Sequence, residues 1–110
     1  MSEQTFEELA GKVRQWASDR QILQNSTAEA QLQKLEEELG ETYAALTAVE
    51  LYHFGSAEDL RDGYGDMLVC VINSMAIAGV DPVEALAHAY GEIKDRTGTL
   101  GADGIFYKDA

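Results

Sequence analysis

Apolar residues recur along most of this chain at spacings of three and four, which is the period of an amphipathic helix. The longest such run spans residues 26–53, and its apolar positions are Leu32, Leu35, Leu39, Leu46, Val49 and Tyr52. A single proline and few β-branched runs interrupt the pattern. The pattern therefore predicts a mostly helical chain.

Four helices are predicted from the residues that begin and end them. Each start is a residue that commonly caps helices, with an acidic residue three positions later. The predicted helices begin at Thr5, Ser26, Ser56 and Asp81, and they end near Arg20, His53, Gly79 and Arg96. Pro82 in the first turn of the last helix and Gly55 just beyond the second support these limits.

The segment from Gly98 to Ala110 has a different character, because glycines punctuate it and the apolar run Ile105-Phe106-Tyr107 is short. This segment is predicted to be extended or hairpin-like. The whole chain, residues 1–110, has the length of one domain. We predict an all-α fold, a four-helix bundle with a short irregular C-terminal tail.

Composition narrows the possible partners. With 8 basic and 20 acidic residues the formal charge is -12, which argues against nucleic acid or an anionic membrane as a partner. Cys70 is the only cysteine, so a disulfide framework and a cysteine-based zinc site are excluded. The start of the chain does not resemble a signal peptide, and apolar runs stay well below about 20 residues. A soluble, cytoplasmic protein is expected.

Two pairs of carboxylates are the strongest chemical signal in the sequence. Glu38 and Glu41 lie three residues apart, and Asp62 and Asp66 lie four apart, so each pair shares one helix face. Like charges at this spacing destabilise a helix unless a positive partner offsets them. A hard divalent cation with oxygen ligands, Mg²⁺ first, is the simplest partner.

Three glycines, Gly40, Gly63 and Gly65, fall inside the predicted helices beside these carboxylates. Each costs about 1 kcal/mol relative to alanine in a helix interior. Either two helices pack closely there, or a metal or ligand approaches the backbone. Their place beside both carboxylate pairs favours the second interpretation.

These residues resemble the MazG-type nucleotide pyrophosphohydrolases of the all-α NTP pyrophosphatase superfamily. Their hallmark is Glu-Glu-x-x-Glu on one helix and Glu-x-x-Asp on the next. Residues 37–41 match the first half, whereas the second half reads Gly63-x-x-Asp66, with Asp62 as the substitute for the missing glutamate. The segments 16–20 and 89–108 also resemble small single-domain members, many of them from phages, so the similarity covers nearly the whole chain.

The resemblance implies Mg²⁺-dependent hydrolysis of (deoxy)nucleoside triphosphates to the monophosphate and pyrophosphate, with Mn²⁺ able to substitute. The implied metal ligands are Glu38, Glu41 and Asp66, with Asp62 as the fourth. Glu37, slightly off that face, orients a ligand or acts as the base that positions water, so Glu37 and Glu38 are the catalytic candidates. House-cleaning of nucleotides is one role such enzymes take.

Three further residues are candidates for substrate binding. Lys94 and Arg96 follow the fourth helix and are expected to contact phosphate oxygens. The same positions also suit cations that complement a helix C-terminus. Trp16 is a candidate to stack on the base, although an amphipathic first helix would also bury a tryptophan in the core, which is the simpler interpretation.

Two other functions fit parts of the sequence. A non-catalytic helical dimer or interaction module of the same fold is supported by Gly63, where the motif lacks its glutamate. A di-iron carboxylate bundle is suggested by Glu50-x-x-His53, but His88 has no glutamate three residues before it. The apolar surface of such long helices, and the pairing of bundles in relatives of this kind, predict a homodimer or a homotetramer.

Overall fold

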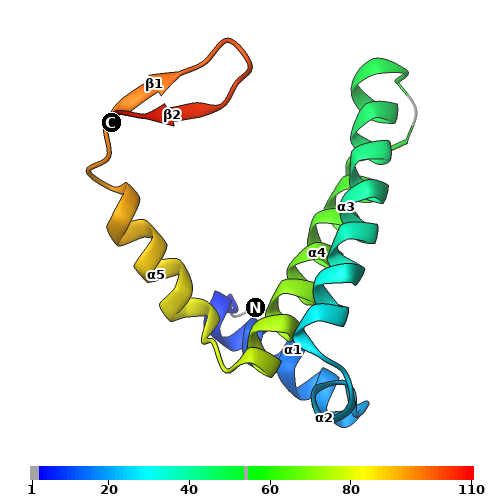
Figure 1. The fold of residues 1–110 in the computed structure, drawn as a ribbon. Coiled ribbons are helices and arrows are strands. Elements are labelled where there is room, and N and C mark those ends of the chain that lie inside the picture. Colours follow the sequence, from blue (N-terminus) through cyan, green and yellow to red (C-terminus); the bar gives the residue numbers. More distant parts are fainter. Residues whose placement is uncertain (1–2, 54) are drawn as a thin grey trace.

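The computed structural model describes residues 3–53 and 55–110, which form five helices and a two-stranded hairpin (Figure 1). The predicted all-α class is confirmed. Helix α1 (Phe6–Asp19) begins as expected, because the Thr5 hydroxyl accepts a hydrogen bond of 3.1 Å from the Glu8 amide. Gln21, at φ 65°, then turns the chain into a short helix α2 (Ile22–Asn25), which the apolar pattern did not reveal.

Helix α3 (Ala28–Leu51) begins one residue later than predicted. Thr27, not Ser26, caps it, because the Thr27 hydroxyl accepts from the Ala30 amide at 3.0 Å. Ser26 instead closes α2, and its hydroxyl accepts a hydrogen bond from the Gln31 side chain. The helix stops at Leu51 rather than near residue 53, since the backbone of His53 is left-handed at φ 58°.

Helix α4 (Ala57–Ala78) has the predicted limits. Ser56 and Asp59 form a capping box at its start, and Gly79 at φ 78° ends it. Helix α5 (Pro82–Ile93) starts as predicted, with the Asp81 carboxylate accepting from the Glu84 amide at 2.9 Å. It ends at Ile93, three residues before the predicted end, in a turn that leads directly into the hairpin.

The C-terminal tail is a hairpin, one of the two forms predicted for it. Strand β1 (Gly98–Leu100) pairs in antiparallel fashion with strand β2 (Phe106–Lys108), and Thr99 lies opposite Tyr107. Gly104 supplies the positive φ, 82°, that the connecting turn needs.

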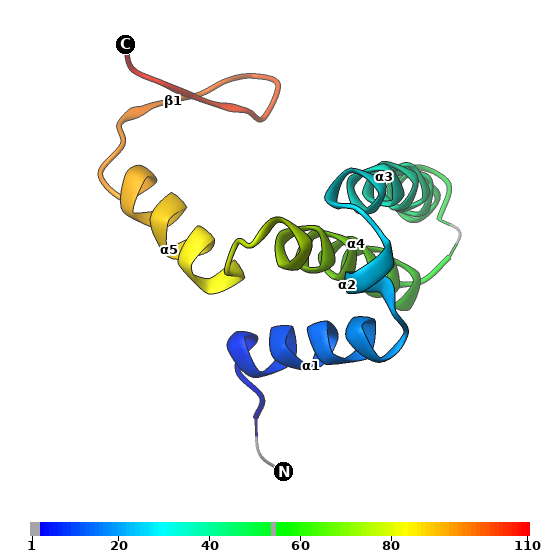
Figure 2. The same ribbon diagram turned by 60° about the horizontal axis from the view of Figure 1, so that its bottom comes forward.

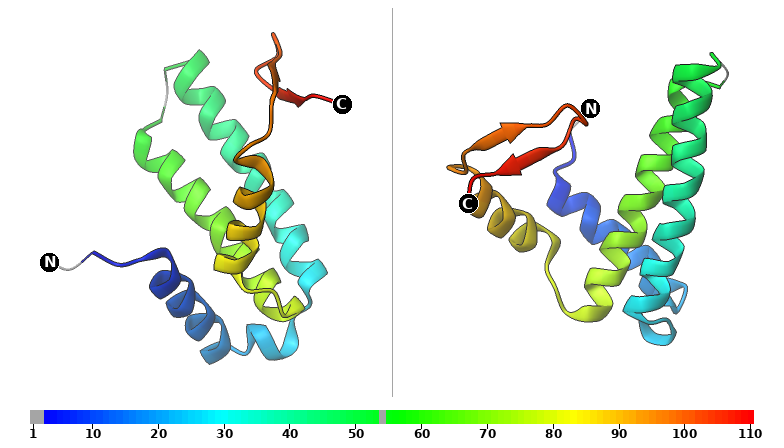
Figure 3. Two further views of the ribbon diagram at one scale, coloured as in Figure 1. Left: turned by 90° about the vertical axis from the view of Figure 1, so that its left-hand side faces the viewer. Right: turned by 45° about the horizontal axis from the view of Figure 1, so that its top comes forward.

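The elements are arranged in two parts. Helices α3 and α4 form a long antiparallel pair, and α1 lies across the α4 side of that pair (Figures 1 and 2). The start of helix α5 contacts α1. From there α5 and the hairpin project away from the α3–α4 pair (Figure 3). We call residues 82–108 the arm.

The helices are held together by few buried side chains. The best-buried apolar residues of the described chain are Ala10, Ala17, Cys70 and Ile72. A polar contact supplements them: the Ser74 hydroxyl donates to the Ala28 carbonyl oxygen at 2.9 Å and fixes α4 to the start of α3.

Among residues 3–53 and 55–110, no single helix is long and apolar enough to cross a membrane. Helices α4 and α5 together reach that length and composition, but the chain bends by 101° between them.

Candidate functional site

A pocket of about 380 Å³ opens between α1, α3 and α4, beside α2. Its lining residues are Trp16, Ile22, Gln31, Lys34, Glu38, Asp66, Val69, Cys70 and Asn73. Helix periodicity explains this set, because residues 31, 34 and 38 share one face of α3 and residues 66, 69, 70 and 73 share one face of α4. The structure thus brings Glu38 and Asp66, 28 positions apart in the sequence, to the same hollow.

Glu38 is the more enclosed of the two catalytic candidates. Its side chain is 13% exposed, against 58% for Glu37. The Lys34 ammonium lies 3.1 Å from a Glu37 oxygen and 3.6 Å from a Glu38 oxygen. The hydrogen bond and charge of Glu37, followed by those of Glu38, raise the pKa of Lys34. A cation therefore already lies beside these two carboxylates.

The pKa of the Cys70 thiol depends on burial and on the charged side chains around the pocket. Burial raises the pKa of this thiol above its usual value. The negative charges of Glu38 and Asp66 raise it further, while the Lys34 ammonium acts in the opposite direction. Cys70 is thus a buried neutral thiol, and it experiences carboxylates from both helices at once.

The other two proposed metal ligands lie outside this pocket. Glu41 and Asp62 are exposed and lie one helical turn from Glu38 and Asp66, respectively. Within residues 3–53 and 55–110, His, Cys, Asp and Glu side chains do not gather in groups of three or more at metal-binding spacing. The donor chemistry still suits Mg²⁺, because Glu38 and Asp66 offer hard oxygen atoms from two facing helices.

Asn73 is a polar residue of the pocket that the sequence did not single out. It is only 2% exposed, and its Oδ1 atom accepts no hydrogen bond from the described residues. An unsatisfied buried acceptor costs about 1–3 kcal/mol. Asn73 lines the pocket, but the oxygen itself has almost no accessible surface, so a ligand donor would reach it only if the side chains that cover it moved.

Trp16 forms a wall of the pocket. The prediction that it is buried in the core is wrong, because 44% of the residue is exposed. It also borders a second hollow of about 410 Å³ between α1 and α4, which it shares with Asp66. The Arg20 guanidinium lies 4.6 Å from the centroid of the indole ring, a cation–π contact that holds the ring.

Lys94 and Arg96 are not brought to the pocket. Lys94 is the C-terminal cap of α5, and Arg96 lies in the turn before β1, where its amide donates to the Ile93 carbonyl at 2.9 Å. Both are exposed, and both belong to the arm, which points away from α3 and α4 (Figure 1).

Close helix packing, rather than a ligand, explains Gly63. A Cβ atom at position 63 would lie 2.6 Å from the Thr42 hydroxyl oxygen, so a larger residue collides with α3. Thr42 is buried and cannot move freely, since its hydroxyl donates to the Glu38 carbonyl at 2.7 Å. For Gly40 and Gly65 no such neighbour is found within 4 Å among the described atoms.

The end of helix α3 does not support the di-iron alternative. Helix α3 ends at Leu51, and His53 has a left-handed backbone. Glu50 and His53 therefore do not occupy one face of a helix, as a Glu-x-x-His ligand unit requires.

Three polar lining residues were not predicted from the sequence, namely Gln31, Lys34 and Asn73. Helix spacing was the available signal, since Lys34 lies four residues before Glu38 and Asn73 lies seven after Asp66. No family model matches this chain, and neither does a curated protein or a solved structure. The MazG resemblance therefore rests on the motif residues themselves.

Proposed function

We propose that this chain is a Mg²⁺-dependent nucleoside triphosphate pyrophosphohydrolase. The observation that carries the proposal is the shared pocket of Glu38 and Asp66. The two halves of the acidic motif meet there across α3 and α4, next to an aromatic wall, Trp16. A solvated acidic helix face, the ordinary explanation for a charge run, does not require such convergence.

Glu38 and Asp66 would hold the metal ion in this proposal. Glu41 and Asp62, which lie outside the pocket, would have to turn toward the ion to complete the ligand set. Bound Mg²⁺ supplies neutralisation of phosphate charge and activation of water. The Lys34 ammonium, paired with Glu37 and Glu38, offsets part of the carboxylate repulsion around this site.

Glu37 is suited to proton transfer. Its carboxylate is 58% exposed and next to the pocket, so it can accept the proton of an attacking water. Water adds at the phosphorus of the α-phosphate, the bond to the bridging oxygen breaks, and pyrophosphate leaves. The products are a nucleoside monophosphate and pyrophosphate.

Two pocket residues are suited to the nucleoside. The exposed part of the Trp16 ring offers a stacking surface. The unpartnered Asn73 oxygen would accept a hydrogen bond from a base N–H group once the side chains that cover it move aside. Both come from the pocket that also holds Glu38, so base and triphosphate would occupy one continuous site.

The test is pyrophosphate release from a panel of NTPs and dNTPs with Mg²⁺ or Mn²⁺. The expected result is monophosphate and pyrophosphate in equal amounts, abolished by a chelator. Glu38→Gln and Asp66→Asn are expected to remove activity while the exposed control Glu36→Gln retains it. Release of orthophosphate, or full activity in Glu38→Gln, contradicts the proposal.

The second candidate is a non-catalytic interaction module. Its specific support is Gly63, whose place against Thr42 leaves no room for the motif glutamate. A folded protein that hydrolyses none of the nucleotides with either metal would favour this function.

A further inference from the structure

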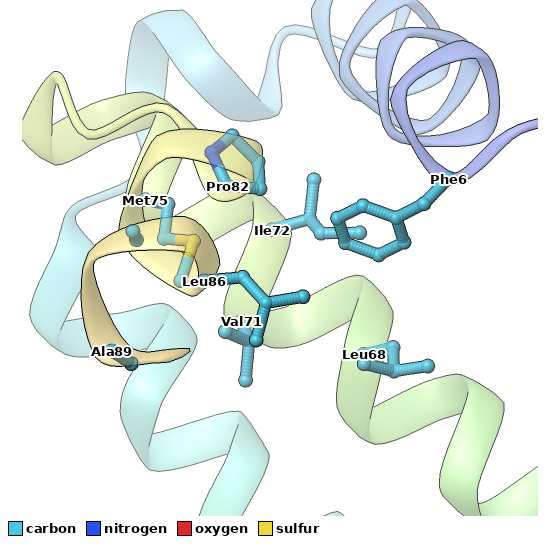
Figure 4. A pocket seen from close by; sticks show the side chains of 9 residues that line it. Phe6, Leu68, Val71, Ile72, Met75, Pro82, Leu86 and Ala89 are labelled. Carbon is cyan, nitrogen blue, oxygen red and sulfur yellow. The ribbon is translucent and has the colours of Figure 1, made fainter. Parts of the chain in front are cut away.

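The hollows of the described chain differ in the charge of their lining. The hollow between α4, α5 and the start of α1, about 350 Å³ in volume, is lined by apolar residues, of which Phe6 and Leu86 are examples in Figure 4. The pocket of Glu38 and Asp66 also contains Lys34. Among the described residues that line this second pocket, Lys34 is the only basic one. A polyphosphate that enters the pocket therefore meets one cation of the same chain there.

The Lys34 ammonium is shared between two carboxylates of the acidic motif. It lies 3.1 Å from a Glu37 oxygen and 3.6 Å from a Glu38 oxygen. The Glu38 side chain is 13% exposed, whereas the Lys34 side chain is 50% exposed. Lys34 thus pairs with an enclosed carboxylate while half of its own side chain remains in solvent, where the flexible lysine stem can adopt other rotamers.

Stabilisation of helix α3 alone explains this contact less well. A lysine four residues before a glutamate is the less favourable order of the two charges on a helix, and exposed ion pairs contribute little to stability. Within residues 3–53 and 55–110, Lys34 is the only basic residue that forms an ion pair with a carboxylate of the acidic motif. The position of Lys34 at the pocket is therefore the informative feature.

A divalent ion held by Glu38 would compete with Lys34 for the same carboxylate. The ion repels the ammonium twice as strongly as a single positive charge at the same distance would. The ammonium must then leave Glu38, but residue 34 stays on the face of α3 that lines the pocket. An ammonium binds phosphate oxygens well as a compact point charge. The displaced ammonium would therefore still reach a polyphosphate in this pocket.

We propose that Lys34 is an exchangeable counter-ion of this site. Without metal it neutralises Glu37 and Glu38, and when Mg²⁺ binds it moves to an oxygen of the polyphosphate and positions that group. This inference rests on the proposed function, because it requires that Glu38 holds the ion. Lys34 thereby lowers the affinity for the metal alone and raises the affinity for polyphosphate in the presence of metal. These two effects have opposite signs, which a purely structural ion pair does not produce.

The test is binding to the full chain without turnover. Electron paramagnetic resonance measures the affinity for Mn²⁺ alone, and calorimetry measures the affinity for inorganic pyrophosphate with saturating Mg²⁺. Lys34→Met is expected to bind Mn²⁺ about tenfold more tightly and pyrophosphate about tenfold more weakly. Lys34→Arg keeps the charge and is expected to stay close to the parent in both measurements. Arg61→Met, the matched control, removes one charge from an exposed ion pair with Glu58 outside the pocket and is expected to leave both affinities close to those of the parent.

The Mn²⁺ measurement separates this inference from the proposed function. If Mn²⁺ binds the parent but not Glu38→Gln, and both affinities are unchanged in Lys34→Met, the role of Lys34 is overturned and the metal site stands. A parent that binds no Mn²⁺ overturns both proposals.

A chemical measurement on the parent chain tests the exchange without any substitution. The rate at which Lys34 is acylated, followed by mass spectrometry, is expected to rise when Mg²⁺ releases the ammonium from Glu37 and Glu38. It is expected to fall again when pyrophosphate is added. A rate that neither addition changes overturns the exchange of Lys34 between carboxylate and phosphate.

Discussion

At the scale of single residues, Thr42 and Gly63 determine how closely α3 and α4 approach each other. The side chain of Thr42 fills the space that any side chain at position 63 would need. A glutamate there, as in the MazG motif, would push the helices apart and move Glu38 away from Asp66. The glycine at position 63, where the motif that this chain resembles has a glutamate, is thus coupled to the presence of Thr42.

A pair of alanine substitutions tests this packing. Gly63→Ala is expected to lower the melting temperature, because overpacking costs about 1–3 kcal/mol and exceeds the helix-propensity gain of about 1 kcal/mol. Gly65→Ala, two residues away with open space at its Cβ, is expected to raise it. Adding Thr42→Ala to Gly63→Ala restores part of the loss. Equal shifts for the two glycines would contradict the packing argument.

Asn73 gives a second prediction at this scale. Asn73→Leu removes the unpartnered oxygen while keeping the volume, so the folded protein is expected to be as stable as the parent or more so. KM for a nucleoside triphosphate is expected to rise about tenfold, the equivalent of roughly 1.4 kcal/mol, while tripolyphosphate hydrolysis stays unchanged. A lower melting temperature with unchanged KM would assign Asn73 to folding alone.

Part of the site could be predicted from the sequence. Glu38 and Asp66 were predicted to share a site because their spacing places each on an identifiable helix face, and both line the same pocket. Asn73 was not, because a lone asparagine in an apolar helix gives no signal until its surroundings are known. The exposure of Trp16 depends on how α1 crosses α4, which helix periodicity does not specify.

At the scale of elements, the hairpin contains its own pH-sensitive contact. The Tyr107 hydroxyl donates to the Asp103 carboxylate at 2.6 Å, and the same carboxylate accepts from the Ile105 amide at 3.0 Å. The hydrogen bond from Tyr107 lowers the pKa of Asp103, and it raises the pKa of Tyr107.

These directions fix the pH range of the contact. Because the folded pKa of Asp103 is depressed, its contribution is fully present above the unfolded value of 3.8 and is lost as pH falls through the folded value. We expect the hydrogen-exchange protection of the Ile105 amide to decline as the pH falls through the folded pKa of Asp103. Asp103→Asn is expected to abolish this acid dependence, and a variant that keeps it would show that another group titrates.

Helix starts were predictable because caps are local, and the Ser56 and Asp81 caps were both correct. The start of α3 was predicted one residue too early, because two neighbouring residues can both cap a helix. Ser26 and Thr27 both qualify, and the intervening α2, only four residues long, decides between them by using Ser26 for its own end. A single helical turn carries too few apolar positions to be recognised by periodicity.

At the scale of the whole molecule, Lys94 and Arg96 lie on the arm, remote from the pocket of the same chain (Figure 1). If they bind phosphate, a second copy must supply them. Lys94→Ala and Arg96→Ala are therefore expected to lower kcat/KM for a triphosphate at least about tenfold, with small changes in thermal stability. Normal hydrolysis with a lower melting temperature would make them helix-end cations.

A mixing experiment separates the two origins of these cations. Copies carrying Glu38→Gln are expected to be inactive, and copies carrying Arg96→Ala are expected to keep about a tenth of the parent activity or less. After subunit exchange, random dimers that share sites across the two-fold axis would recover about a quarter of the parent activity, since half of them contain one intact site. If each site is completed within one chain, the mixture would show no gain over the average of the two separate variants.

The arm follows helices α1 to α4 in the sequence, and this order has a consequence for biosynthesis. Helices α1 to α4 leave the ribosome first, and the antiparallel α3–α4 pair forms from contacts close in sequence, which fold rapidly. The exposed apolar residues Leu86, Tyr90 and Ile93 of α5 emerge only afterwards, when the faces of α1 and α4 next to α5 are already in place. Late synthesis thereby shortens the time during which the exposed apolar side chains of α5 can bind unrelated nascent chains.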